Sequence, residues 1–167
     1  MENNTETFDG AEQQDLIAQE PHEFTQYVYA SQGQRFLNWL IDNLLIRFGI
    51  NYLTGLLIGA LLAMAFPDFM YSVMIGENQV GLYLIIYILA IFNYVIYYTL
   101  CEKLFRGYTL GKLITGTRAI RQDGQELSFR NALLRSLSRC VPFEVFSGFS
   151  TLTWHDSWTD TMVIKAR

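Results

Sequence analysis

The sequence predicts an all-α integral membrane protein with two transmembrane helices, at about residues 36–66 and 80–105. Hydrophobic residues make up 51% of the 167-residue chain, which is high for a soluble domain of this size. Residues 48–66 and 80–101 carry no charge, and either run is long enough to cross a bilayer. Acidic residues gather before the first run and basic residues after the second, a segregation typical of a membrane contact.

The chain divides into a tail and a membrane domain. Residues 1–26 are polar and acidic, so we expect a disordered N-terminal tail, and residues 27–167 form the membrane domain. An acidic beginning also predicts no signal peptide. Cys101 and Cys140 have neither the spacing of a zinc site nor that of a disulfide framework, and we expect them to be single thiols.

The first apolar run is longer than a membrane requires. A helix over residues 36–66 would measure roughly 45 Å, against roughly 30 Å of hydrocarbon. Residues 48–66 can cross alone, and Pro67 should end the helix. Gly55, Gly59 and Ala63 recur every four residues, which either indicates close helix packing or reflects ordinary membrane-helix composition.

Basic residues predict the orientation of the two spans. The connection at residues 67–79 contains no Lys or Arg, whereas many follow the second span. Because basic residues concentrate in cytoplasmic segments, we expect both termini to be cytoplasmic and the connection to face outward.

Beyond the second span the pattern predicts an amphipathic helix from Phe129 to about Val141, with Ser128 as its N-cap. Leu134 and Leu137 share its apolar face, while Arg135 lies on the polar face. Such a helix either lies on a membrane surface or packs on its own domain.

Two shorter features complete the predicted fold. Residues 141–154 are apolar but short for a span, so we expect a re-entrant or interfacial segment, with a third span as the alternative. Residues 117–122 and 161–165 have the composition of strands and predict a small two-stranded β ribbon.

Polar residues at the start of the first span are the strongest functional signal. Arg35, Asn38 and Asp42 fall on one face of a helix, so we expect a hydrogen-bonded or ionic cluster among them and some partner. Asp42 either binds or relays a cation or proton, or pins the helix to other segments. The second interpretation is favoured, because Asp42 would lie roughly 9 Å below the hydrocarbon edge.

Other chemistry finds little support in the sequence. Residues 107–112 resemble a phosphate-binding loop only superficially, since the glycine spacing is short and no Ser or Thr follows Lys112. His155 and Asp156 lack a nucleophile motif and further metal ligands, so Asp156 should pair with Arg135 or Arg139. We therefore expect no enzyme activity, no cofactor, no metal and no nucleic-acid partner.

The chain also resembles a known family. Tyr29-Ala-Ser31, Arg35-Phe36 and Ile41-Asp42 are similar to the opening of the RDD family of small bacterial membrane proteins. The later similarity comprises Glu102, Gly107-Tyr-Thr-Leu-Gly-Lys112, Gly116, Asp123-Gly124, Arg135, His155-Asp156, Thr161 and Val163. The family's arginine and two aspartates carry over onto Arg35, Asp42 and Asp156. The resemblance implies a bacterial inner membrane, and in some members exchange of monovalent cations for protons.

Together these observations predict a membrane scaffold or accessory subunit, with a monovalent cation/proton transporter, or a subunit of one, as the alternative. Expected partners are the lipid bilayer, a second copy or another membrane protein, and for the alternative a cation or proton. The sharpest expectation is one polar layer at the cytoplasmic membrane edge. Arg35, Asn38 and Asp42 should meet later polar residues there: Glu102, Lys112, Arg135, His155 and Asp156.

Overall fold

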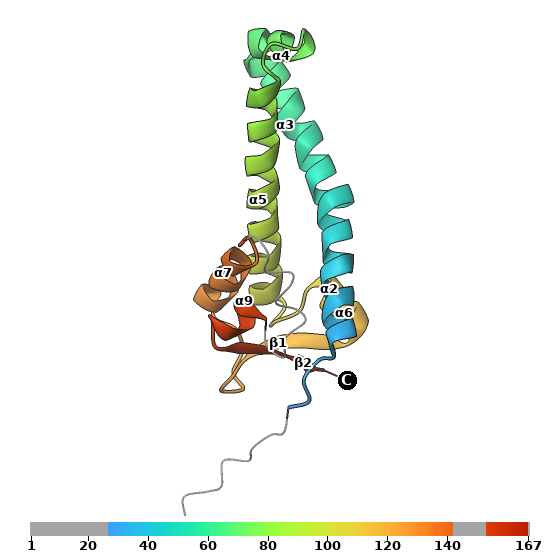
Figure 1. The fold of residues 1–167 in the computed structure, drawn as a ribbon, viewed down its shortest axis with the longest axis vertical. Helices are drawn as coiled ribbons and strands as arrows, with labels where there is room; N and C mark the ends of the chain where they lie inside the picture. Colours follow the sequence, from blue (N-terminus) through green and yellow to red (C-terminus); the bar gives the residue numbers. More distant parts are fainter. Residues whose placement is uncertain (1–26, 142–152, 167) are drawn as a thin grey trace, which may run out of the picture.

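A computed structural model describes residues 27–141 and 153–166. Two long helical stretches stand side by side and are joined at one end by a short helix, α4 (Figure 1). At the opposite end, short helices and a β ribbon pack around the ends of the long helices. The predicted tail at residues 1–26 and most of the predicted third segment at residues 141–154 lie outside the described residues.

The first stretch consists of α2 (Gln32–Leu44), the π-helix η1 (Leu45–Ile50) and α3 (Asn51–Ala65). Ser31 caps α2 through a capping box, because its hydroxyl accepts from the Gln34 amide at 3.2 Å while the Gln34 side chain accepts from the Ser31 amide. The stretch spans 34 residues, Gln32–Ala65, close to the predicted helix. Nothing in the sequence predicts the π-helical turn.

The second stretch is α5 (Gln79–Leu104), again close to its predicted bounds. Both stretches are long and apolar enough to cross a membrane. In the most apolar part of the first stretch 0% of the residues are buried within the protein, and in that of α5 11% are. The core helix of a soluble protein would be mostly buried, so the exposed apolar surface distinguishes these helices from one. The two predicted spans are confirmed as helices of suitable length and composition.

Pro67 separates the two stretches as expected, but it also begins a helix. The chain turns at Phe66, and Pro67 is the first residue of α4 (Pro67–Met74). A proline is well suited to that position, because its fixed φ fits the first turn and its missing N–H would have had no partner. The connection is therefore more ordered than a plain loop.

Beyond α5 the chain forms α6 (Leu110–Thr115) and then an antiparallel ribbon of β1 (Thr117–Arg121) and β2 (Thr161–Lys165). Thr117 lies opposite Lys165 in the register. The segment before α2 joins the other edge of β2, where the Ala30 amide donates to the Val163 carbonyl at 3.0 Å. The ribbon thus ties the end of the described chain to its beginning.

The amphipathic helix α7 (Phe129–Ser138) begins after its predicted N-cap, Ser128, and packs along α5 (Figure 1). Its orientation is the reverse of a soluble amphipathic helix. The polar face with Arg135 and Ser136 is buried against the protein, while Leu134 and Leu137 on the apolar face point outward. Packing on its own domain therefore involves the polar side, because charged partners lie there.

Candidate functional site

A layer of buried polar side chains lies beneath the spanning parts of the long helices. We define this polar layer by the ionisable residues that it contains and by the hydrogen-bonding residues between them. Its ionisable members are Arg35, Asp42, Glu102, Lys112, Arg135, Arg139, His155 and Asp156. They come from α2, α5, α6, α7 and α9 (Trp154–Ser157), so the layer joins segments far apart in the sequence.

Asp42 is buried on α2, with 1% of its surface exposed, and its two oxygens accept three hydrogen bonds. The Tyr97 hydroxyl donates at 2.7 Å, the Thr109 hydroxyl at 2.6 Å and the Gly111 amide at 2.8 Å. All three donors are neutral. Asp42 therefore connects α2 to α5 and to the beginning of α6 without an ion pair among the described residues.

This arrangement corrects the predicted cluster on α2. Asn38 shares the buried face of the helix with Asp42, but its amide bonds to the hydroxyls of Thr115 and Thr117. Arg35 reaches a different partner altogether, Asp156 on α9, at 3.1 Å. The shared face was predicted correctly, but the hydrogen bonds of Asn38 and Asp42 and the ion pair of Arg35 go to later segments.

Glu102 is the centre of the charged part of the layer and is completely buried. One carboxylate oxygen accepts from the Lys112 ammonium at 2.7 Å and from the Arg139 guanidinium at 3.0 Å. The other oxygen accepts from Nε of Arg135 at 2.9 Å. Three cations surrounding one buried carboxylate compensate for its removal from water.

Arg135 continues the network from Glu102 to Asp156. Its Nη1 donates to Asp156 at 2.5 Å and also contacts the Thr161 hydroxyl on β2. Asp156 in turn accepts from Arg35 and from the Thr153 hydroxyl at 3.0 Å. The expectation that Asp156 pairs with Arg135 or Arg139 is thus met by Arg135. Arg135 holds two carboxylates from separate helices, and no part of it is exposed.

His155 lies at the edge of this network. Its Nε2 is 3.7 Å from an Asp156 oxygen and 3.1 Å from the Thr153 hydroxyl. Within residues 27–141 and 153–166 there is no group of three or more His, Cys, Asp or Glu side chains that could hold a metal ion. The shorter contact of His155 is with the Thr153 hydroxyl, which itself donates to Asp156.

Burial and neighbouring charges shift the pKa values of Lys112 and Asp156. Burial, the largest influence, lowers the pKa of Lys112 to about 8, although Glu102 opposes this change. For Asp156, burial acts to raise the pKa, but Arg135, His155 and Arg35 together hold it well below its usual range. Lys112 is thus a buried amine that titrates near neutral pH, whereas Asp156 stays ionised.

Residues 107–112, which failed as a phosphate loop, build much of the polar layer. Gly107 has φ +93°, and a Cβ there would lie 1.9 Å from the backbone oxygen of Ala119. At Gly111 a Cβ would lie 2.4 Å from the backbone oxygen of Asn38. The glycines bring the chain close to its neighbours, so that Thr109 and Lys112 can reach their partners.

Sequence reasoning missed the donors to Asp42. Thr109 and Gly111 enter the sequence analysis only within the family motif, and Tyr97 does not enter it at all. A tyrosine among apolar residues two turns or less from a cluster of charges is the signal that could have identified Tyr97, because a buried hydroxyl needs a partner.

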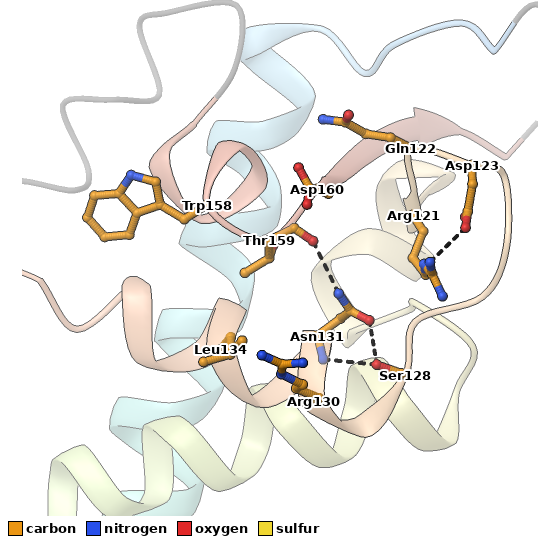
Figure 2. A pocket seen from close by; sticks show the side chains of 10 residues that line it. All are labelled: Arg121, Gln122, Asp123, Ser128, Arg130, Asn131, Leu134, Trp158, Thr159 and Asp160. Carbon is orange, nitrogen blue, oxygen red and sulfur yellow. Dashed lines mark hydrogen bonds and ion pairs between the residues drawn. The ribbon is translucent and has the colours of Figure 1, made fainter.

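A separate hollow lies where the turn that follows β1 meets the beginning of α7 and the end of α9. Its volume is about 560 Å³. Figure 2 shows that Asn131 bridges the hollow to Thr159, whose carbonyl it reaches at 3.2 Å, and that Leu134 and Trp158 line the same space. None of the ionisable residues of the polar layer lines it.

Two exposed apolar helices above a buried ionic network define a helical membrane protein rather than a soluble domain. The family comparison agrees, since a model of the RDD family matches residues 29–158. The match covers most of the chain, and the protein belongs to the RDD family. Neither the curated proteins nor the solved structures contain a match to this chain.

Proposed function

We propose that this RDD protein is a non-enzymatic membrane scaffold or accessory subunit, held together by its polar layer. The observation that carries the proposal is the set of contacts of Asp42. Both of its oxygens are engaged by donors from α5 and α6, as a carboxylate that fixes helices requires. A carboxylate that carries an ion through the membrane would need free access to that ion.

The other two family residues support the same role. Asp156 is bonded by both Arg35 and Arg135, so the arginine and the second aspartate of the family form one ion pair between α2 and α9. In this proposal the family residues have a structural role. Asp42 connects α2 to α5 and α6, and the ion pair of Arg35 with Asp156 connects α2 to α9.

The location follows from charge and family. We place the protein as a multi-pass protein of the bacterial inner membrane, with both termini in the cytoplasm and the polar layer at the cytoplasmic membrane edge, because Lys and Arg are absent from residues 67–79 and frequent after α5. The partners that we propose are the lipid bilayer and either a second copy or another membrane protein. We propose no nucleic-acid partner and no enzyme activity.

The experiment is purification of the tagged full-length protein in a mild detergent, followed by mass measurement of the intact complex. A scaffold should elute as a defined complex heavier than the 19.3 kDa chain. The Arg106→Ala variant, which loses only an exposed ion pair with Glu126, is a matched control and should keep the complex. A partner-free monomer that exchanges ions by itself would overturn the proposal.

A second function, cation/proton exchange, is favoured by Lys112. A buried amine with a pKa of about 8, bonded to Glu102 at 2.7 Å, can gain and lose a proton near neutral pH. Exchange in vesicles that is lost in Lys112→Met, while that variant keeps its fold and oligomeric state, would establish this function in place of the scaffold.

A further inference from the structure

The outward face of α7 is apolar although no described segment covers it. Phe129, Leu134 and Leu137 expose 55%, 41% and 47% of their surfaces. The opposite face carries Arg135 and Ser136, and both are completely buried against the protein. A helix with its polar side inward and its apolar side outward is expected where the surrounding medium is itself apolar.

The apolar surface continues from α7 onto α9. Trp154 and Trp158 stack with ring centroids 5.7 Å apart and expose 40% and 58% of their surfaces. Leu134 and Trp158 line the same hollow, so the two helices present neighbouring parts of one surface (Figure 2). We call this the α7–α9 face. Exposed tryptophans are enriched at the membrane–water boundary, where one side of the ring is apolar and the other wet.

The level of α7 along the long helices fits that boundary. Roughly 30 Å of helix separates Arg47 on η1 from Pro67, which is about the thickness of the hydrocarbon. Asp42 therefore lies roughly 7 Å below Arg47, within the layer of lipid headgroups. Arg139, at the end of α7, lies 4.2 Å from the ring centroid of Tyr98, next to the Tyr97 that bonds Asp42.

Two arginines on the outside of the molecule agree with this level. Arg47 is exposed on η1, and within the described residues it forms no ion pair. Arg130 is exposed in the first turn of α7, beside the apolar face. A guanidinium at the edge of an apolar surface can lie against lipid phosphates while its stem remains in apolar surroundings.

We propose that the α7–α9 face is embedded in the lipid leaflet next to the polar layer, with its apolar side chains among the acyl chains and Arg130 among the phosphates. The surface is continuous with the lipid-facing side of α5, along which α7 packs. The buried network of Glu102, Arg135 and Asp156 is then enclosed between α5 and an interfacial helix whose far side is lipid. This inference rests on the membrane-spanning helices and not on the scaffold proposal.

The test uses tryptophan fluorescence of the full-length protein in phosphatidylcholine/phosphatidylglycerol vesicles whose acyl chains carry bromine. Trp39, Trp154 and Trp158 are the three tryptophans of the chain, so Trp39→Phe leaves only the pair on the α7–α9 face. We expect brominated lipid to quench this variant by at least half, and the water-soluble quencher acrylamide to quench it less than it quenches the variant unfolded in denaturant.

A matched pair of single-tryptophan variants sharpens the result. In a protein with all three tryptophans changed to Phe, Leu137→Trp reports the apolar face and Gln125→Trp reports the exposed loop after β1. Bromine should quench the first variant several-fold more than the second, with the reverse order for acrylamide. If this background does not fold, spin labels at Leu137→Cys and Gln125→Cys in a Cys101→Ser/Cys140→Ser protein supply the same comparison through oxygen and nickel accessibility.

Two results would overturn the proposal. Equal acrylamide quenching at both positions would show that the face lies in water. Absence of quenching by either agent at position 137, together with crosslinking of two chains through Leu137→Cys, would show that a second copy covers the face instead of lipid.

Discussion

The spanning parts of α3 and α5 and the polar layer beneath them are held together in different ways. α3 contains no buried residue, and a Cβ added at Gly55 or Gly59 would meet nothing within 4 Å. In the polar layer a Cβ at Gly107 or Gly111 would collide with backbone atoms. α3 is thus loosely packed along most of its length, whereas in the polar layer backbone segments lie in direct contact at the two glycines.

Polar contacts follow the same division. The spanning helices share one small cluster, in which the Asn93 amide donates to the side-chain oxygens of Asn51 and Thr54 at 2.8 Å each. The polar layer instead contains buried carboxylates bonded to several donors each. Lipid cannot drive apolar helices together as water does, so specific polar contacts at the membrane edge determine the arrangement of the segments.

The largest expected effect comes from Arg135→Met in the polar layer. The change leaves Arg35 as the one guanidinium bonded to Asp156 and deprives Glu102 of one of its cations, so we expect a loss of about 3–5 kcal/mol of stability. Thermal unfolding in detergent measures it. Arg106→Ala is the control, because that exposed pair with Glu126 should contribute less than about 1 kcal/mol. Equal melting temperatures for the two variants would refute a structural role for the network.

Glycine substitutions compare the two regions directly. Gly111→Ala forces a Cβ to within 2.4 Å of the Asn38 backbone, so we expect a loss of about 1–3 kcal/mol from overpacking. Gly59→Ala enters open space and should not destabilise the monomer. Melting temperatures and elution volumes of both variants check this. A strong effect at Gly59 accompanied by dissociation of an oligomer would show that a partner packs on α3.

The pH dependence of stability should reveal the buried Lys112. Its pKa in the folded protein is about 8, below the 10.5 of an ordinary lysine, so the unfolded chain binds more protons between these values. Stability relative to Lys112→Met should therefore rise as the pH increases from about 8 to 10.5, and stay constant below about 7. The exposed Lys165→Met is the control and should show no such slope against wild type. A slope of the opposite sign would mean that Lys112 is stabilised in its charged form.

The smallest expected effect is in the spanning region. Asn93→Ala removes the hydrogen bonds to Asn51 and Thr54, and interhelical hydrogen bonds of this kind contribute about 0.6 kcal/mol on average. Resistance to unfolding by a harsh detergent is a suitable measurement. If Asn93→Ala lost as much stability as Arg135→Met, polar contacts would stabilise the spanning helices and the polar layer equally, contrary to this account.

The sequence was most informative where one physical factor dominates. Length and hydrophobicity predict the two spans, and Pro67 and Ser128 mark helix boundaries through their own backbone and side-chain chemistry. Charges that are costly in a membrane predict that Arg35, Glu102, Arg135 and Asp156 come together. These predictions do not depend on the three-dimensional arrangement of the other segments.

Pairings within the layer could not be predicted in the same way. Asp42 bonds to Thr109 and Gly111 because α6 approaches α2 at a glycine, a contact between residues nearly 70 positions apart. Its third partner, Tyr97, comes from α5. Helical spacing groups residues on one face but does not identify what that face meets. The sequence likewise predicts the apolar face of α7. Whether that face points toward the protein or away from it depends on the partners of Arg135, which lie on α5 and α9.

The central claim is that the family carboxylates hold segments together and carry no ion. It is tested most directly by reconstituting the purified protein in vesicles with an internal pH dye and imposing a Na⁺ or K⁺ gradient. The account predicts no cation-driven pH change beyond that of empty vesicles, with Asp42→Asn indistinguishable from wild type in this assay but less stable to heat. A cation-driven pH change in wild type that disappears in a correctly folded Asp42→Asn protein would contradict it.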